Sequence, residues 1–382
     1  MTEPGTLRWR FEVQTADRSA PLGRGGVPSV EAVQGTVCVR GRDLYALEAV
    51  TGKPRWRLDT RDQFVAMQVD DGTVYAAEAD SLLAVAIDSG TKRWEASVPP
   101  ESVLATDGNT IYAGGGSYPD ERVAAIDADT GIEKWSVPTV DVPAALGVAD
   151  GTLYVGTADL TTTLERKDLC AVDTATGTQR WEFEAHDVRD IVLGGDVALV
   201  AERGYDPTLC VVNRMTGTEA WRLDDEDVAD TDGSVGRVAA DAETAYLAFH
   251  PDDTAGGRHW VCAVTAATGR FRWQFETPEP VRSLTVAGGR LYVGTEAGTL
   301  SVVDADTGSE RWRFEADDAV SSVTVGEDAV YVGAGESVYA LAAGTPSDGT
   351  TETRVYGSCP NCGARPPGED AVYCPSCGER LP

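Results

Sequence analysis

The stretch VRSLTVAGGRLYVGTEAGTLSVVDADTGSERWRFE, residues 281–315, decides the fold of this chain. It holds four short runs rich in Val, Leu, Tyr and Phe, centred on Leu284, Tyr292, Val302 and Trp312. The segments between the runs contain glycine, which adopts positive φ without steric cost and so permits tight turns. No window of helical period interrupts the runs. The stretch therefore predicts four consecutive β-strands joined by turns.

The same unit recurs along the chain, each time marked by a glycine four residues before a tryptophan. The tryptophans are 47, 38, 41, 46, 40, 52 and 39 residues apart, a period typical of four-stranded propeller blades. The eight pairs are Gly5/Trp9, Gly52/Trp56, Gly90/Trp94, Gly131/Trp135, Gly177/Trp181, Gly217/Trp221, Gly269/Trp273 and Gly308/Trp312.

A short polar residue precedes several of these glycines by four positions, as in Asp127, Asp173, Asn213 and Asp304. We expect its side chain to bond the backbone of its own turn, as Asp and Asn commonly do. The tryptophan that follows should then fill the space between neighbouring sheets with its large apolar surface.

The phase of the repeat indicates how the ring closes. A single tryptophan strand, residues 7–13, precedes the first full unit, and three strands near 322–325, 329–332 and 338–341 follow the last tryptophan strand. Pairing the first strand with the last three would complete an eighth blade and leave no open sheet edge. The sequence thus predicts an all-β, eight-bladed propeller over residues 1–343.

The composition is strongly acidic, with 62 Asp and Glu against 32 Lys and Arg and a net charge of −30. Such a surface repels nucleic acid and anionic lipid, so neither is expected as a partner. It is typical of a halophile, such as a haloarchaeon, with a high-salt cytoplasm. The first four residues are acidic and polar, and no run of 18 apolar residues occurs, so we expect a cytoplasmic protein without a membrane span.

The basic residues concentrate beside the repeat tryptophans. Seven of the eight tryptophans follow directly on Arg or Lys, for example Arg55, Lys134, Arg180, Arg272 and Arg311. Because neighbours on a strand point to opposite faces, these cations should decorate the outer strand of each blade and discourage edge pairing.

Four cysteines near the C-terminus form two matched Cys-Pro-x-Cys-Gly knuckles: Cys359, Cys362, Cys374 and Cys377. Two such knuckles can present four thiolates tetrahedrally to Zn²⁺, whereas a redox Cys-x-x-Cys pair would need a different context. The segment resembles the zinc-ribbon family. We therefore expect a flexible linker over 344–355 and, over 356–382, a ribbon that holds one structural zinc and serves as a protein-docking surface or purely to stabilise the chain. The single cysteines Cys38, Cys170, Cys210 and Cys262 should instead be buried free thiols.

Three segments carry a resemblance to a known repeat. They are LYALEAVTGKPRW at 44–56, LCAVDTATGTQRW at 169–181 and LSVVDADTGSERW at 300–312. These resemble the pyrroloquinoline-quinone (PQQ) type of propeller repeat, which is shared by quinoprotein dehydrogenases and BamB-like assembly factors. The resemblance is specific for the blade and says little about activity.

Two classes of function compete. A PQQ-dependent dehydrogenase would, by the resemblance, need a calcium site, a quinone pocket and usually two adjacent cysteines, and no two cysteines are adjacent here. We therefore expect no PQQ. The preferred interpretation is a non-enzymatic cytoplasmic scaffold, a monomeric propeller that binds an unidentified protein partner or a small polar ligand.

The loops before the innermost strands should line the mouth of the central channel. Charged residues in or next to them form the predicted rim site: Asp62, Asp141, Asp187, Arg189, Arg237 and Arg282. The alternative is that these loops merely keep the protein hydrated in salt. A further hairpin, 249–260, places His250 and His259 around Asp252 and Asp253, which leaves a second metal site open against an ordinary extended loop.

Overall fold

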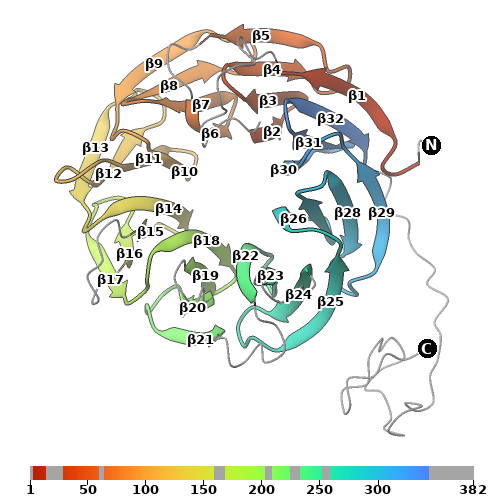
Figure 1. Ribbon diagram of the computed structural model, residues 1–382. Coiled ribbons are helices and arrows are strands. Elements are labelled where there is room, and N and C mark those ends of the chain that lie inside the picture. The colour runs from red at the N-terminus through yellow and green to blue at the C-terminus, as the bar shows by residue number, and fades with distance from the viewer. Residues whose placement is uncertain are drawn as a thin grey trace, which may run out of the picture. The chain divides into compact units, whose positions relative to one another are not determined.

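The computed structural model describes residues 3–13, 29–59, 64–158, 168–202, 209–223, 233–251 and 259–343. Its compact unit runs from Thr2 to Ala343. Within it, eight four-stranded antiparallel sheets form a ring around a central opening (Figure 1). The predicted all-β, eight-bladed propeller is therefore confirmed. The predicted linker, 344–355, and ribbon, 356–382, with its four cysteines, lie outside the described residues.

Blades one to four are built as follows. Blade one comprises β2 (Ser29–Val33), β3 (Thr36–Arg40), β4 (Leu44–Glu48) and β5 (Pro54–Leu58). Blade two comprises β6 (Phe64–Asp70), β7 (Thr73–Glu78), β8 (Ser81–Ala86) and β9 (Lys92–Ser97). Blade three comprises β10 (Val103–Thr106), β11 (Thr110–Gly115), β12 (Arg122–Asp127) and β13 (Glu133–Pro138). Blade four comprises β14 (Val142–Ala149), β15 (Thr152–Ala158), β16 (Leu169–Asp173) and β17 (Gln179–Phe183).

Blades five to eight continue the order. Blade five comprises β18 (Val188–Gly194), β19 (Val197–Glu202), β20 (Leu209–Asn213) and β21 (Glu219–Leu223). Blade six comprises β22 (Gly233–Ala240), β23 (Thr244–Pro251), β24 (His259–Thr265) and β25 (Phe271–Thr277). Blade seven comprises β26 (Val281–Ala287), β27 (Arg290–Thr295), β28 (Thr299–Asp304) and β29 (Glu310–Glu315). Blade eight comprises β30 (Val320–Val325), β31 (Ala329–Ala334), β32 (Ser337–Ala342) and, from the other end of the chain, β1 (Leu7–Glu12).

Blade eight confirms the predicted closure. Its strand order is β1-β32-β31-β30, so the N-terminal strand supplies the outermost position. β1 runs antiparallel to β32, with Trp9 opposite Ala340 and Phe11 opposite Val338. This pairing covers an edge that would otherwise be free to pair with another chain.

The glycine and the tryptophan of the repeat join neighbouring blades. Gly131, at φ +73°, lies against Trp94 of the previous blade, and a Cβ at Gly131 would come within 2.7 Å of the indole ring. Trp94 Nε1 donates a hydrogen bond of 2.9 Å to the carbonyl of Ala128, in the same turn as the glycine. The same arrangement recurs at Gly177 with Trp135, so the glycine is required both for its backbone conformation and for space.

The predicted turn bonds are also present. Asp173 Oδ1 accepts from the backbone N–H of Thr176 at 2.9 Å, and Asn213 Oδ1 accepts from that of Thr216 at 3.1 Å. Asp127 and Asp304 make the equivalent bonds. These contacts set the turn that brings each outermost strand back along its blade.

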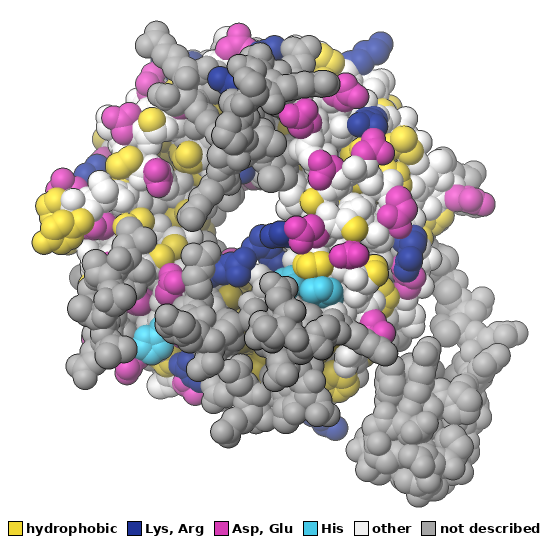
Figure 2. All heavy atoms as spheres, in the orientation of Figure 1, with side chains coloured by type: hydrophobic (Ala, Val, Ile, Leu, Met, Phe, Trp, Pro, Cys, Tyr) yellow, Lys and Arg dark blue, Asp and Glu magenta, His cyan; other side chains and the backbone are white. Residues whose placement is uncertain are grey.

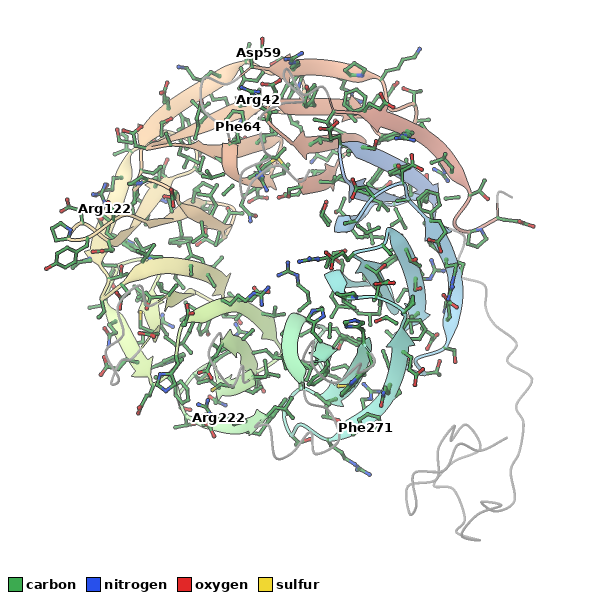
Figure 3. The ribbon with its side chains drawn as sticks, viewed as in Figure 1. Arg42, Asp59, Phe64, Arg122, Arg222 and Phe271 are labelled. Atoms are coloured by element: carbon green, nitrogen blue, oxygen red, sulfur yellow. The ribbon has the colours of Figure 1, made fainter. Side chains whose placement is uncertain are left out.

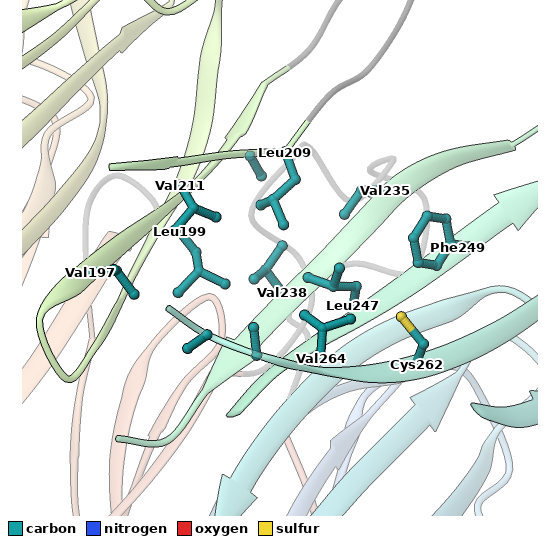
Figure 4. Packing of buried hydrophobic residues seen from close by; sticks show 13 residues of the cluster. Val197, Leu199, Leu209, Val211, Val235, Val238, Leu247, Phe249, Cys262 and Val264 are labelled. Carbon is teal, nitrogen blue, oxygen red and sulfur yellow. The ribbon is translucent and has the colours of Figure 1, made fainter. Parts of the chain in front are cut away.

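The hydrophobic core lies between blades and not at the centre of the ring. One cluster joins Val197, Leu199 and Leu209 of blade five to Val238 and Leu247 of blade six (Figure 4). Three of the four single cysteines are buried as predicted, and Cys170 is half-buried. Apolar side chains therefore fill the seams between the blades.

The outer-strand cations lie where the sequence predicts. Arg55 Nη1 donates to Thr36 Oγ1 at 2.8 Å, and Lys134 Nζ donates to Thr110 Oγ1 at 2.9 Å. Arg180 forms an ion pair with Asp173 at 2.7 Å. These side chains therefore bind back onto their own blade.

The described residues include no helix that is long and apolar enough to cross a membrane.

Candidate functional site

The central opening is bordered by the first strand of each blade: β2, β6, β10, β14, β18, β22, β26 and β30 (Figures 1 and 2). In six of these described strands the pairing with the second strand skips one residue, which makes a β-bulge. The skipped residues are Val65, Ala144, Arg189, Gly236, Arg282 and Ser321. A bulge of this kind redirects one side chain away from the regular alternation.

The bulges of blades five and seven carry arginine. Val188, just before Arg189, is fully buried, and Val281, just before Arg282, is 1% exposed, whereas both arginines are exposed. Each bulge therefore anchors an apolar residue in the seam and turns the next side chain out of it. Figure 2 shows basic side chains gathered at one edge of the opening, with histidine beside them.

Blade six, between these two, has glycine at its bulge. A Cβ at Gly236 would lie 1.9 Å from both Cδ2 and Nε2 of His250, so the imidazole occupies the space of a side chain at this position. Arg237 follows directly and reaches the next blade, where its Nε donates to the carbonyl of Arg282 at 2.7 Å. Blades five, six and seven thus bring Arg189, Arg237 and Arg282 together.

The electrostatics of the cluster are unfavourable for its arginines. Burial lowers the pKa of Arg237, and the neighbouring charges of Arg189 and Arg282 lower it further. Asp190 is the nearby acid on β18; burial raises its pKa, and Arg237 and Arg189 only partly oppose this shift. Mutual repulsion and partial desolvation therefore act on the same guanidinium group.

The arginines of this cluster differ from those elsewhere in how they are paired. Arg282 binds Glu296 at 2.7 Å, but within the described part of the chain Arg189 has no hydrogen bond or ion pair, and Arg237 bonds only to a carbonyl. By contrast Arg222, at the periphery (Figure 3), holds Glu202 at 3.0 Å, and Arg214 holds Asp150 at 2.7 Å.

His250 adds an uncharged polar group. Burial is the main cause that lowers its pKa to about 4, with further contributions from His259, Arg189, Arg282 and Arg237. The imidazoles of His250 and His259 are edge-on, with ring centroids 5.8 Å apart. Nδ1 of His259 is buried and has no hydrogen-bond partner among the described residues. At neutral pH His250 is therefore neutral and can donate from one ring nitrogen.

The possible second metal site in the hairpin 249–260 stays a prediction, because part of the hairpin is not described. Asp252 and Asp253 lie outside the described residues. Among the residues that the structure does describe, no three His, Cys, Asp or Glu are placed to hold a metal ion.

The acidic members of the predicted rim do not join the arginines as a group. Asp187 lies two residues before Arg189, at φ +44°, and its N–H donates to Asp168 Oδ2 at 3.1 Å. Asp141 is 9% exposed in the turn before β14, and Asp62 lies outside the described residues. Of the six predicted residues, the structure places Arg189, Arg237 and Arg282 near one another, and the binding role of all six stays a prediction.

A second charged position on the channel wall was missed by the sequence reasoning. Glu31, on β2, accepts a hydrogen bond of 2.9 Å from the backbone N–H of Val69 on β6. Its burial raises its pKa to about 7, while that bond and the charge of Arg40 act in the opposite direction. Arg40 in turn donates to the carbonyl of Phe64 at 3.0 Å. Nothing in the local text SVEAV distinguishes this Glu from a surface residue.

The single thiols are poor nucleophiles. Burial raises the pKa of Cys38 and of Cys262 to about 12 and that of Cys170 to about 11. They belong to different blades and remain protonated at neutral pH.

The chain belongs to the PQQ_2 family, described as outer membrane protein assembly factor BamB. Matches to the family model span residues 2–136, 119–284 and 257–375. The family defines the repeat and the propeller, in agreement with the blades described above.

Two curated relatives are similar over a small part of their length. The serine/threonine-protein kinase AfsK of Streptomyces coelicolor is 34% identical over 115 residues, which is 28% of this chain and 14% of the kinase. AfsK of Streptomyces griseus is 30% identical over 129 residues, or 31% of this chain and 15% of the kinase.

Solved structures share the fold. The computationally designed Ika8 protein aligns with a TM-score of 0.66 at 15% identity, over 84% of this chain and 97% of its own. The quinohemoprotein alcohol dehydrogenase ADHIIG of Pseudomonas putida HK5 aligns with a TM-score of 0.64 at 14% identity, over 93% of this chain and 79% of its own. At these identities the likeness concerns the fold alone, and a designed protein and an enzyme share it.

Proposed function

We propose that this chain is a non-enzymatic cytoplasmic binding protein whose propeller presents the channel mouth to a ligand or partner. The observation that carries the proposal is the convergence of three arginines from three blades, with Arg189 unpaired and Arg237 bonded only to a carbonyl among the described residues. Groups held in an unfavourable arrangement by a rigid scaffold are a common mark of a binding site.

The competing function is a PQQ-dependent dehydrogenase. Such an enzyme depends on its cofactor for the redox step, and the protein supplies position and electrostatics. The separated, protonated thiols of the described blades favour binding over redox chemistry. The likeness to ADHIIG is limited to the fold and does not alter this preference.

The C-terminal segment enters the proposal as a second docking surface. Cys359, Cys362, Cys374 and Cys377 would hold one structural Zn²⁺, and the acidic composition suits a halophile's cytoplasm. Elemental analysis should find one zinc per chain and none in a Cys374→Ser/Cys377→Ser variant. Zinc retained by that variant would exclude this ligand set.

Affinity capture at molar salt tests the main proposal. The full chain is compared with residues 1–343 alone and with an Arg189→Gln/Arg237→Gln variant, and we expect the double variant to lose the molecule captured through the channel mouth. In parallel, PQQ, Ca²⁺, an alcohol and a redox dye are added to the folded full chain. Substrate-dependent dye reduction would overturn the proposal.

A further inference from the structure

This inference rests on the proposed function and names the class of ligand. We propose that Arg189, Arg237, Arg282 and His250 form a binding site for the oxyanion group of a small ligand, either a phosphate or a carboxylate. The site lies at the edge of the central opening where β18, β22 and β26 adjoin.

The backbone positions these groups with little freedom. Arg189 and Arg282 leave the sheet at β-bulges whose preceding valines are buried in the seams. His250 is held in the space above Gly236, and Arg237 is tied to the carbonyl of Arg282. The strands therefore fix the backbone from which each of these side chains extends, so little main-chain entropy is lost when a ligand binds.

The unused hydrogen-bonding capacity is that of an anion receptor. A guanidinium group has five N–H donors, and Arg237 spends its Nε–H on a carbonyl, which leaves its two terminal nitrogens free among the described residues. Arg189 has all five donors unused in the same part of the chain. Paired terminal nitrogens match the oxygens of phosphate and carboxylate bidentately.

The charge balance favours occupation. Among the residues that the structure describes, two carboxylates, those of Asp190 and Glu296, oppose the three guanidinium groups. Within the described part of this acidic chain, no ion pair is formed by Arg189 or Arg237. A bound anion would relieve the repulsion that lowers the pKa of Arg237.

The surroundings favour a small ligand over a polyanion. The net charge of −30 repels extended polyanions such as nucleic acid. In molar salt the screening length falls to about 3 Å, so a small anion experiences chiefly the groups that it touches.

The test is titration of the full chain with inorganic phosphate and, separately, with malonate, at constant molar ionic strength. Binding is followed by calorimetry and by the NMR signal of His250. Saturable binding of phosphate supports a phosphate ligand, and saturable binding of malonate alone supports a carboxylate ligand. Either anion should raise the pKa of His250 above about 4, because it offsets the charges of Arg189, Arg237 and Arg282 that face the ring together with His259.

The variants separate this site from general charge effects. Arg189→Gln, at an exposed position with no hydrogen bond or ion pair to a described residue, should weaken binding by about tenfold or more. Arg313→Gln removes the same charge from β29, where Arg313 binds Glu310, and should leave binding unchanged. Absence of saturable binding for both anions, or equal binding by Arg189→Gln, would overturn the inference. In that case the proposed binding function would still be supported if affinity capture retains a molecule that the Arg189→Gln/Arg237→Gln variant loses. Substrate-dependent dye reduction would instead overturn the proposed binding function.

Discussion

The two sides of the channel wall handle charge in opposite ways. On β2, the buried carboxyl of Glu31 is satisfied internally by the N–H of Val69 and lies near Arg40. Across β18, β22 and β26, Arg189 and Arg237 are brought together without acidic partners bound to them in the described residues. The first arrangement completes a seam between blades one and two. The second arrangement leaves N–H donors of Arg189 and Arg237 unused among the described residues.

This difference shows how to separate structural charges from functional ones in a repeat protein. Both sides occupy equivalent strands, so the repeat itself does not explain the contrast. A charge that serves stability has its partner inside the fold, because an unpaired buried charge is costly. A charge that serves binding can remain unsatisfied where the scaffold over-determines its position.

The largest expected effect comes from breaking the ring on which both sides depend. Deletion of residues 1–12 removes β1, the buried Trp9 and the whole ladder with β32. We expect loss of the cooperative thermal transition seen by circular dichroism at molar salt. Truncation after residue 343 is the control and should melt close to the full chain. An N-terminal deletion that melts like the parent would show that β1 is not needed for closure.

The next effect tests the Glu31 side. Its pKa is raised from 4.5 to about 7 in the folded state, so its stabilising contribution is complete below about pH 4.5 and is lost as pH rises through 7. The unfolding free energy of the parent should therefore fall by about 3 kcal/mol from pH 4.5 to pH 8, whereas that of Glu31→Gln should lack this decrease.

Urea unfolding at the two pH values and constant salt measures this difference. Glu133→Gln, an exposed change of the same charge at the start of β13, is the control and should shift stability little. If the stability of both variants depends on pH as that of the parent does, the pKa of Glu31 is not raised by burial.

A smaller effect on stability is expected when Gly236, at the bulge of β22 beside the three arginines, is replaced by alanine. Gly236→Ala places a methyl group 1.9 Å from the ring of His250, which must move. We expect a loss of about 1–3 kcal/mol. The pKa of His250 should also rise from about 4 toward 6.5 as the ring leaves its buried position. NMR titration of the imidazole reads this directly. Gly147→Ala on β14, whose Cβ would meet its nearest atoms at 3.3 Å, serves as the comparison.

The smallest change in stability is expected where the effect on binding is large. Arg237→Gln loses one hydrogen bond but also the repulsion from Arg189 and Arg282, so unfolding free energy should change by less than about 1 kcal/mol. Arg222→Gln, which removes the ion pairs that this arginine makes with the buried Glu202 and with Glu219, should cost about 3 kcal/mol. Urea unfolding measures both variants. An equal loss of unfolding free energy for Arg237→Gln and Arg222→Gln would contradict the distinction between an arginine without a bound carboxylate and an ion-paired one.

Most of the fold could be predicted because its determinants are local in sequence. The Asp-x-x-Thr-Gly turn bonds to itself, and the glycine and tryptophan repeat at a blade's length. The rim arginines were predicted individually, but their convergence depends on bulges, which are properties of strand register. Glu31 escaped notice because its hydrogen-bond donor, the N–H of Val69, lies on the next blade, 38 positions away in the sequence.

The closure of blade eight also has a kinetic consequence. The indole bonds between successive blades join residues 31 to 45 positions apart, whereas Arg10 on β1 bonds Ser337 across 327 positions. The entropic cost of closing a flexible loop grows with the logarithm of its length. Forming the Arg10–Ser337 contact in an unfolded chain therefore costs about 2 kcal/mol more than forming a contact between neighbouring blades. We therefore expect the two ends of the chain to join late in folding, after the intervening blades have formed and shortened the flexible segment between the ends.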